Sequence, residues 1–416
     1  MRLLIKSVLA FLIAFLSFYI VYDTTLKKEA PKIPYEIIES AEINEYYVYG
    51  KRLNIKGSIN LDYSFKEVNL LLYDEKEIKV PLSYNFNDGV LNFYISDKIN
   101  GGYDLEDLDI GNYYVLLEVV CDNEVKYYNL KNNTSYDGVN YYTLSKTNHK
   151  VTFTTNYHYD TLYIKVTSSK SDDAYDIIID PGHGGKDTGA YNSGHSEKAI
   201  NLDVALKLGE YLKKNNVKVT YTRKKDVYLT NYSVDGSPSR LSIINNSHAK
   251  YIIALHLNST TSKKAKGVEV YTNPNINYDF AKSIADNIVK DTGTIYSPNM
   301  TSKMYNGVYT RLLTKKHLEN NIEEAKEKGI EPYDIKENTA YYFMIREPGG
   351  IVTHAYVDGR DKEVGVNSNY NGNIGIEGYL IEMGYLTNSD DYNNLVNNSK
   401  KYAEAIGNAI IKELGY

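Results

Sequence analysis

The spacing of apolar residues changes near residue 170, and this change most constrains how the 416-residue chain can fold. From about Tyr46 to Val166, apolar and polar residues alternate, most clearly over residues 78–86. Turn residues such as Asn87-Asp88-Gly89 separate the alternating segments. Several short strands with this alternation predict an all-β, sandwich-like domain over residues 46–168. We find no catalytic cluster in this range, so we expect a structural spacer or a binding module.

Beyond a polar junction at residues 168–173, strand and helix patterns alternate. A short apolar run at 177–179 has the character of a buried strand. From Glu197 onward, apolar residues recur at helical spacing at Ile200, Val204 and Leu208. Further strands are expected at 217–221 and 251–257. This alternation predicts an α/β domain over 175–416, with a mostly parallel sheet and helices on both faces. Functional sites in such folds gather beyond the carboxyl ends of the strands.

The amino terminus has the pattern of an export signal or membrane anchor. Arg2 and Lys6 precede an uncharged apolar run over residues 7–22, and Asp23 ends this run. At about 1.5 Å per residue the run is about 24 Å long, and residues 3–5 extend it enough to span a bilayer. A cleaved signal peptide fits the pattern, but an uncleaved signal-anchor is favoured because no clear cleavage site follows. We expect a transmembrane segment at 1–25, a linker at 26–45 and the rest of the chain outside the cell.

Composition excludes some classes of protein. Lysine and arginine number 47 against 53 aspartates and glutamates, which gives a net charge of −6. A general nucleic-acid binder needs a basic face, so nucleic acid is not an expected partner. Cys121 is the only cysteine, which rules out an internal disulfide framework and a cysteine-rich zinc finger.

Two histidines and a glutamate stand where an α/β sheet gathers its functional side chains. His183 follows the strand at 177–179, Glu197 opens the next helix, and His256 lies near the end of the strand at 251–257. Two imidazoles and a carboxylate are a usual ligand set for a catalytic zinc ion, with a fourth position left for water. Zinc lowers the pKa of that water to about 7, which generates a nucleophile at neutral pH.

Other interpretations of these residues stay open. Each of the three alone is more often structural, and only their joint pattern indicates a metal site. His195, two residues before Glu197, is an alternative second imidazole. The same ligand types also suit divalent ions other than zinc.

The segments around these residues resemble the zinc-dependent N-acetylmuramoyl-L-alanine amidases, which are peptidoglycan amidases. In family order, the matching segments are 177–190 (IIIDPGHGGKDTGA), 196–212, 219–230, 240–259, 266–272 and 380–391 (LIEMGYLTNSDD). Position by position, the resemblance implies His183, Glu197 and His256 as ligands of Zn2+ and Glu382 as the catalytic carboxylate. It also implies that Arg346 positions substrate, with an internal ion pair as an equal alternative. The first 170 residues lie outside the resemblance.

The resemblance implies a cell-wall hydrolase that cleaves the amide bond between N-acetylmuramic acid and L-alanine of peptidoglycan. A carboxylate such as Glu382, beside a metal-bound water, can take the proton of that water and return it to the leaving amine. A catalytically silent wall-binding scaffold is one alternative, but the presence of all three expected ligands and Glu382 argues against it. A zinc peptidase that cuts elsewhere in the stem peptide is another.

The expected partners follow from this function and from the amino terminus. We expect peptidoglycan as substrate, and the membrane as a partner through residues 1–25. The chain would then be a single-pass membrane protein with an extracellular catalytic domain, or a secreted one if the segment is cleaved. A protein activator is left open, as is binding of the cell wall by the β domain.

Two segments exceed the shortest form of the family. One, at about 311–338, is charged and helix-like, and the other, at 349–377, is rich in glycine and asparagine. Both precede Glu382, so we hypothesise that one of them is a lid or regulatory element. A solvated helix that only decorates the fold is the alternative for the first.

Overall fold

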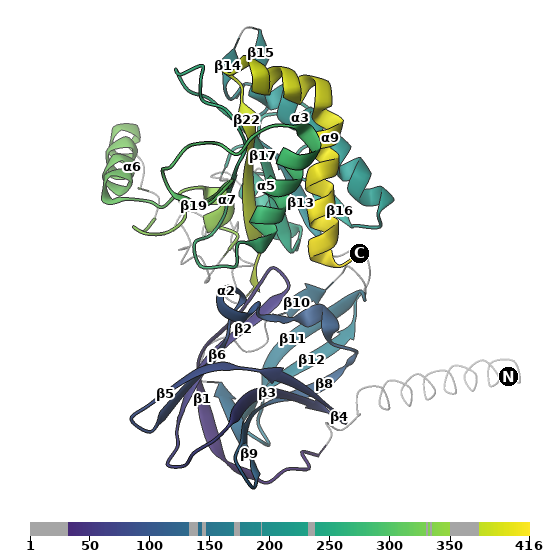
Figure 1. Ribbon diagram of the computed structural model, residues 1–416, viewed down its shortest axis with the longest axis vertical. Coiled ribbons are helices and arrows are strands. Elements are labelled where there is room, and N and C mark those ends of the chain that lie inside the picture. Colours follow the sequence, from purple (N-terminus) through teal and green to yellow (C-terminus); the bar gives the residue numbers. More distant parts are fainter. Residues whose placement is uncertain are drawn as a thin grey trace, which may run out of the picture.

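Figure 1 shows the computed structural model, with one end of the molecule built mostly from strands, apart from short helices such as α2 (Asp97–Asn100), and with mixed strands and helices at the other end. The structure describes residues 32–132, 140–143, 147–169, 175–192, 194–231, 238–329, 332, 335–349 and 374–416. The predicted transmembrane segment at 1–25 lies outside these residues, as does the start of the predicted linker. Within the described residues, no helix combines the length and the apolar character needed to cross a membrane.

The amino-terminal region is built from strands. They are β1 (Ile37–Tyr49), β2 (Arg52–Asn60), β3 (Glu67–Asp74), β4 (Lys76–Pro81), β5 (Ser83–Asn87), β6 (Val90–Ile95), β7 (Tyr103–Asp104), β8 (Gly111–Val120), β9 (Val125–Asn132), β10 (Asn140–Thr143), β11 (His149–Asn156) and β12 (Thr161–Ser168). Their order is β10-β11-β12-β8-β9-β1-β2-β6-β5, with β3 joined to β4 and β8 and β7 joined to β2. Alternate side chains of these strands, such as Leu53, Leu117 and Ile164, pack together in one apolar core. Whether this region is a separate domain stays a prediction.

Strand β1 begins at Ile37, inside the range predicted to be the linker at 26–45. The first half of the strand is rich in exposed polar residues, which is why its sequence resembles a linker. The segment pairs with β9 from Ile37 to Ile43 and with β2 from Glu42 to Tyr49. Backbone pairing on both sides, rather than apolar composition, therefore makes this segment part of the sheet.

The carboxy-terminal region is an α/β unit around a seven-stranded sheet. The strand order is β16 (Val219–Tyr221), β13 (Ile177–Pro181), β17 (Tyr251–Asn258), β22 (Glu377–Tyr385), β18 (Glu269–Tyr271), β20 (Val308–Tyr309) and β19 (Lys303–Tyr305). Neighbours from β16 to β22 are parallel, whereas β18 runs antiparallel to β22. The predicted α/β architecture is confirmed, with a parallel centre and a mixed edge.

Helices cover both faces of this sheet. On one face, α3 (Glu197–Lys214), α5 (Asp279–Thr292) and α9 (Ser389–Leu414) pack on a core that includes Ile177 and Ile179. On the other face, α4 (Arg240–Asn246) and α7 (Phe343–Arg346) pack on a core that includes Ile178. Successive residues of β13 thus enter opposite cores, as the alternation of a strand requires. Burial on both faces explains the continuous apolar run of this strand.

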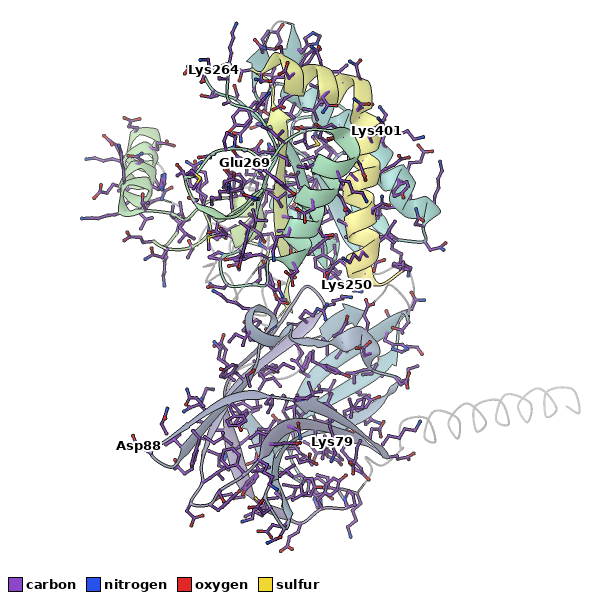
Figure 2. The ribbon with its side chains drawn as sticks, in the orientation of Figure 1. Lys79, Asp88, Lys250, Lys264, Glu269 and Lys401 are labelled. Carbon is purple, nitrogen blue, oxygen red and sulfur yellow. The ribbon has the colours of Figure 1, made fainter. Side chains whose placement is uncertain are left out.

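The two regions meet at the amino ends of the central strands. Tyr47 and Tyr49 of β1 join the α/β core, and β1 pairs in parallel with the short strand β21 (Ile374–Gly375). Figure 2 labels Lys250, the residue before β17, at this junction. Its buried ammonium group contacts Glu106 of the amino-terminal region. The carboxyl ends of the same strands, where the predicted metal ligands lie, face away from the junction.

Candidate metal centre and active site

Two buried arginines shape the loop that carries His183 after strand β13. The Arg223 guanidinium donates to the carbonyls of Pro181 and Gly182, both at 2.9 Å. Arg240 donates to the Pro181 carbonyl at 3.1 Å and also to the His183 carbonyl. The two arginines are only 3% and 4% exposed, so the loop carbonyls are held by groups that solvent cannot replace. We did not predict a role for either arginine.

Two glycines allow the close approach of the metal-binding side chains. A Cβ atom on Gly182 would fall on the imidazole of His256. A Cβ on Gly189 would lie 2.6 Å from Glu197 Oε2 and 2.5 Å from His183 Cδ2. Gly189 also has a φ of 62°, which favours glycine for a second reason. The glycines of this loop are therefore part of the site's construction.

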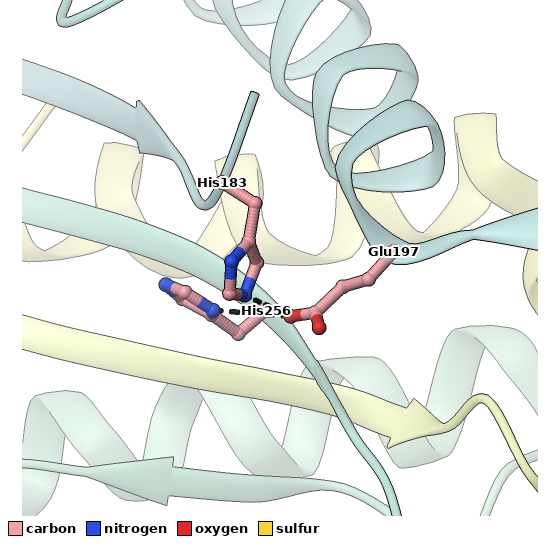
Figure 3. A group of neighbouring side chains, drawn as sticks. All are labelled: His183, Glu197 and His256. Carbon is pink, nitrogen blue, oxygen red and sulfur yellow. Dashed lines mark hydrogen bonds and ion pairs between the residues drawn. The ribbon is translucent and has the colours of Figure 1, made fainter. Parts of the chain in front are cut away.

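His183, Glu197 and His256 converge on one point at the carboxyl ends of the strands, as Figure 3 shows. One ligand atom from each residue lies within 4.8 Å of the other two. Glu197 Oε1 is 3.2 Å from His183 Nε2 and 3.1 Å from His256 Nδ1. The structure thus brings together the three residues predicted to bind a metal ion. Their role as ligands stays a prediction.

Further groups orient these three side chains. Asp187 Oδ2 lies 2.9 Å from His183 Nδ1, which leaves the opposite ring nitrogen, Nε2, directed at Glu197. The Ala190 and Leu257 amides donate to the Glu197 carboxylate at 2.8 and 2.9 Å. Such outer contacts fix the tautomer and direction of metal ligands.

Charge pairing keeps Glu197 ionised despite its burial. Burial raises the pKa of the carboxyl group, but hydrogen bonds with His183 and His256 outweigh it and bring the pKa well below its usual range. Burial likewise lowers the pKa of His183, while Glu197 and then Asp187 raise it, and the net direction is upward. The site is therefore a carboxylate flanked by two imidazoles, a donor set suited to a divalent cation.

Glu382 lies beside this group in the sheet. In the parallel pairing of β17 with β22, Glu382 is the partner of His256, so the two side chains share a face of the sheet. The Glu382 side chain is buried, and its Oε2 atom has no hydrogen-bond partner among the described residues. Burial, followed by the charges of Glu197 and Glu269, raises the pKa of Glu382 well above its usual range. A buried carboxyl group with a raised pKa is suited to proton transfer.

A second buried glutamate, Glu269, extends the same row and was not predicted. It is the antiparallel partner of Glu382 on β18 and is 1% exposed. Its carboxylate accepts hydrogen bonds from Tyr271, Ser297 and Tyr385 at 2.6, 2.6 and 2.8 Å. Asn258 and Asn299 donate to it at 3.0 and 3.5 Å. Glu269 is therefore the centre of a rigid polar network beside the candidate catalytic row.

Two other predicted residues lie away from the cluster. His195 packs its ring against Tyr392, with 4.6 Å between ring centroids, and is not part of the three-residue group. Arg346 is 5% exposed and bonds Glu347 at 2.6 Å and the carbonyls of Ala340 and Tyr341. These contacts are the internal ion pair that we gave as the alternative, and substrate positioning by Arg346 stays a prediction.

The structure describes most of the first extra segment but little of the second. In the first, α6 (Lys315–Lys328) is a mostly exposed helix that stands out from the sheet in Figure 1. Of the second, residues 350–373 lie outside the described residues. A lid or regulatory role for either segment stays a hypothesis.

A protein-family comparison agrees with this geometry. The family model described as N-acetylmuramoyl-L-alanine amidase matches residues 177–331. This part of the chain belongs to the N-acetylmuramoyl-L-alanine amidase family. The matched range contains the three predicted ligands and Glu269 but ends before Glu382.

Individual relatives of the amidase region carry the same family name. The germination-specific N-acetylmuramoyl-L-alanine amidase of Bacillus subtilis is 31% identical over 143 residues, which are 32% of this chain and 59% of that protein. A putative N-acetylmuramoyl-L-alanine amidase of Buchnera aphidicola is 25% identical over 239 residues, which are 56% of this chain and 92% of that protein. The chain thus spans less than two thirds of the Bacillus relative.

A solved amidase structure overlaps with the same part of the chain. The amidase AmiC2 of Nostoc punctiforme is 21% identical, with a TM-score of 0.36 over 58% of this chain and 97% of that one.

Proposed function

We propose that the protein is a zinc-dependent N-acetylmuramoyl-L-alanine amidase that hydrolyses the amide bond between N-acetylmuramic acid and L-alanine of peptidoglycan. The observation that carries the proposal is the convergence of His183, Glu197 and His256 beside the buried Glu382. This arrangement lies in a region that belongs to the amidase family, and the relatives named above are amidases of the same bond by name.

The chemistry of the three donors fits a divalent metal ion. Two ring nitrogens and one carboxylate oxygen lie within 4.8 Å of one another, and Asp187 and two backbone amides already hold the surrounding atoms in place. Zinc accepts this set of ligands and keeps a position open for water or substrate. When bound, the ion would polarise the amide carbonyl and acidify a water molecule.

Glu382 would act first as the general base and then as the general acid of the reaction. Its carboxylate accepts a proton from the water that attacks the amide carbon. The same carboxyl group then donates that proton to the nitrogen of L-alanine as the carbon–nitrogen bond breaks. The products are a free muramyl carboxylate and a stem peptide with a free amino terminus. Burial of Glu382 raises its pKa, which makes it a better proton acceptor than an ordinary glutamate.

The setting of the enzyme is also part of the proposal. Peptidoglycan lies outside the cytoplasmic membrane, which agrees with the export pattern of residues 1–25. We propose a membrane-anchored protein with an extracellular catalytic region, or a secreted one if the signal is cleaved. A protein activator and a wall-binding role for the amino-terminal region stay predictions.

The test is digestion of purified peptidoglycan by three proteins: the wild type, Glu382→Gln, and Glu210→Gln as a control on the exposed face of α3. The wild type and the control should release stem peptides, and Glu382→Gln should release at least 100-fold fewer per unit time. A chelator should abolish release and added zinc should restore it. Release that survives chelation would refute the metal dependence. A folded, zinc-loaded wild type that releases nothing would favour the scaffold alternative.

A further inference from the structure

A pocket of about 330 Å³ opens beside Glu269, the strand neighbour of Glu382, because three of its lining residues hydrogen-bond to the Glu269 carboxylate. It is lined by Thr260, Ala265, Lys266, Ser297, Pro298, Asn299 and Tyr385. Thr260 follows the end of β17 and Tyr385 ends β22, so the pocket lies at the same edge of the sheet as the metal-binding group. Tyr385 is three residues beyond Glu382, which corresponds to about 10 Å along a strand. The pocket is therefore about three extended peptide residues away from the candidate catalytic carboxylate, a distance that two residues and a side chain can cover.

The walls of this pocket are fixed before any ligand arrives. Ser297 and Tyr385 both donate their hydroxyl protons to Glu269 Oε1, and Asn299 donates its amide to the same atom. From outside this group, the Tyr309 hydroxyl holds the carbonyls of Ser297 and Asn299 at 2.8 and 3.1 Å. Three lining residues are thus held by the same buried carboxylate, that of Glu269. A ligand would therefore lose little binding free energy to ordering these side chains.

Lys266 is the charged residue among the seven that line the pocket. Its side chain is 40% exposed, and its ammonium group lies 3.3 Å from Asp390 Oδ2. Asp390 is 73% exposed and sits in the first turn of α9. Such exposed ion pairs contribute little to stability, so a ligand carboxylate can replace Asp390 at small cost. Lys266 is therefore available to a ligand, although a surface aspartate already neighbours it.

We propose that this pocket is a substrate subsite for the acidic second residue of the stem peptide, whose carboxylate pairs with Lys266. The proposal rests on the proposed amidase function, because the scissile bond joins the sugar to the first stem residue. Two extended residues reach about 7 Å from the scissile bond, so the acidic side chain of the second residue covers the remaining distance to the pocket. A volume near 330 Å³ is large enough for one amino-acid residue.

The test uses the full-length protein and two soluble N-acetylmuramoyl tripeptides. They differ only in the second stem residue, which carries either a free carboxylate or a carboxamide. We expect the wild type to have a kcat/KM roughly tenfold higher for the carboxylate form, since ionised hydrogen-bond partners bind more strongly than neutral ones. Lys266→Met should lose this preference through a higher KM for the carboxylate substrate, with kcat little changed. Lys264→Met, an exposed lysine of the same loop labelled in Figure 2, should keep the preference.

Any of three results would refute the proposed subsite. Equal kcat/KM values of the wild type for the two substrates would show that the pocket does not sense the carboxylate. A parallel loss of activity on both substrates in Lys266→Met would assign Lys266 a structural role. If the wild type hydrolyses neither substrate, the amidase function itself fails and the subsite fails with it, whereas the first two results leave the amidase function intact.

Discussion

Replacement of Glu106 by alanine should strongly destabilise the protein through a lysine in the other region. The Lys250 side chain is completely buried at the junction, where its ammonium group contacts Glu106 and lies 3.5 Å from Asp176 Oδ1. Burial, together with the nearby positive charge of Lys51, lowers the pKa of Lys250 well below its usual range, and the charge of Asp104 opposes this effect. Without Glu106, Lys250 either stays charged beside Asp176, which is further away than Glu106, or gives up its proton on folding.

The size of the effect follows from these two alternatives. Loss of one partner from a buried ion pair costs about 3–5 kcal/mol of unfolding free energy. The loss of unfolding free energy cannot exceed the cost of removing the proton from Lys250. For a lysine with a normal pKa of about 10.4, deprotonation at pH 7 costs about 5 kcal/mol. Asp176 remains near Lys250, and its pKa of about 6, raised by burial, leaves it mostly ionised at pH 7. We therefore expect a loss near 3 kcal/mol.

The loss of unfolding free energy caused by Glu106→Ala should become smaller as the pH rises. In Glu106→Ala the folded-state pKa of Lys250 falls further below its unfolded value, so the unfolded chain binds more protons than the folded one. Stability of the variant relative to the wild type then increases with pH until the pH reaches the folded-state pKa of Lys250 in the wild type. At pH 9, removing the proton from lysine costs only about 2 kcal/mol, so the loss of unfolding free energy should not exceed this value. Urea denaturation of both proteins at pH 7 and pH 9, followed by circular dichroism, measures the difference.

An exposed pair on α3 provides the control. Glu210 and Lys214 form an ion pair at 2.9 Å with both side chains about 70% exposed, so Glu210→Ala should leave the unfolding free energy nearly unchanged. A Glu106→Ala loss below about 1 kcal/mol at pH 7 would refute the importance of the buried pair. A large loss that is the same at pH 7 and pH 9 would refute the charge-based explanation.

Three shorter predictions concern the site and its support. Asp187→Asn should weaken zinc binding by roughly 10- to 100-fold in a chelator competition, because Asp187 orients His183; unchanged affinity would contradict that role. His183→Ala should lose zinc by elemental analysis while His195→Ala retains it, and the reverse pattern would revive His195 as the ligand. Gly209→Ala should lower the melting temperature, since its Cβ would collide with the Tyr221 hydroxyl and overpacking costs about 1–3 kcal/mol; an unchanged melting temperature would show that the ring moves freely.

Local sequence patterns predict the parts of the structure that depend on local chemistry. The apolar run at 177–179 predicts a strand buried on both faces, and the helical stripe after Glu197 predicts α3. His183, Glu197 and His256 were predicted to act together, because residues at strand ends and helix starts of an α/β sheet gather at one edge, and the structure brings them together.

The remaining features depend on pairings that are distant in sequence. Glu269 lies beside Glu382 only because β18 pairs antiparallel with β22, and no local pattern specifies that register. Arg223 and Arg240 belong to residue types that are usually exposed, so their burial under the His183 loop was not expected. The sequence predicts a linker over the first half of β1, because the polar residues there do not indicate the pairing with β9. In each case the deciding contact lies tens of residues or more away along the chain.

Hydrolysis in 18O-labelled water reveals whether the protein cleaves the bond between muramic acid and L-alanine. The oxygen of the attacking water ends in the carboxyl group on the carbonyl side of the broken bond. We expect one 18O atom in the lactyl carboxylate of N-acetylmuramic acid and an unlabelled stem peptide that begins with L-alanine, as measured by mass spectrometry. An 18O label in a carboxylate of the peptide itself would refute amidase activity and identify a peptidase that cuts within the stem.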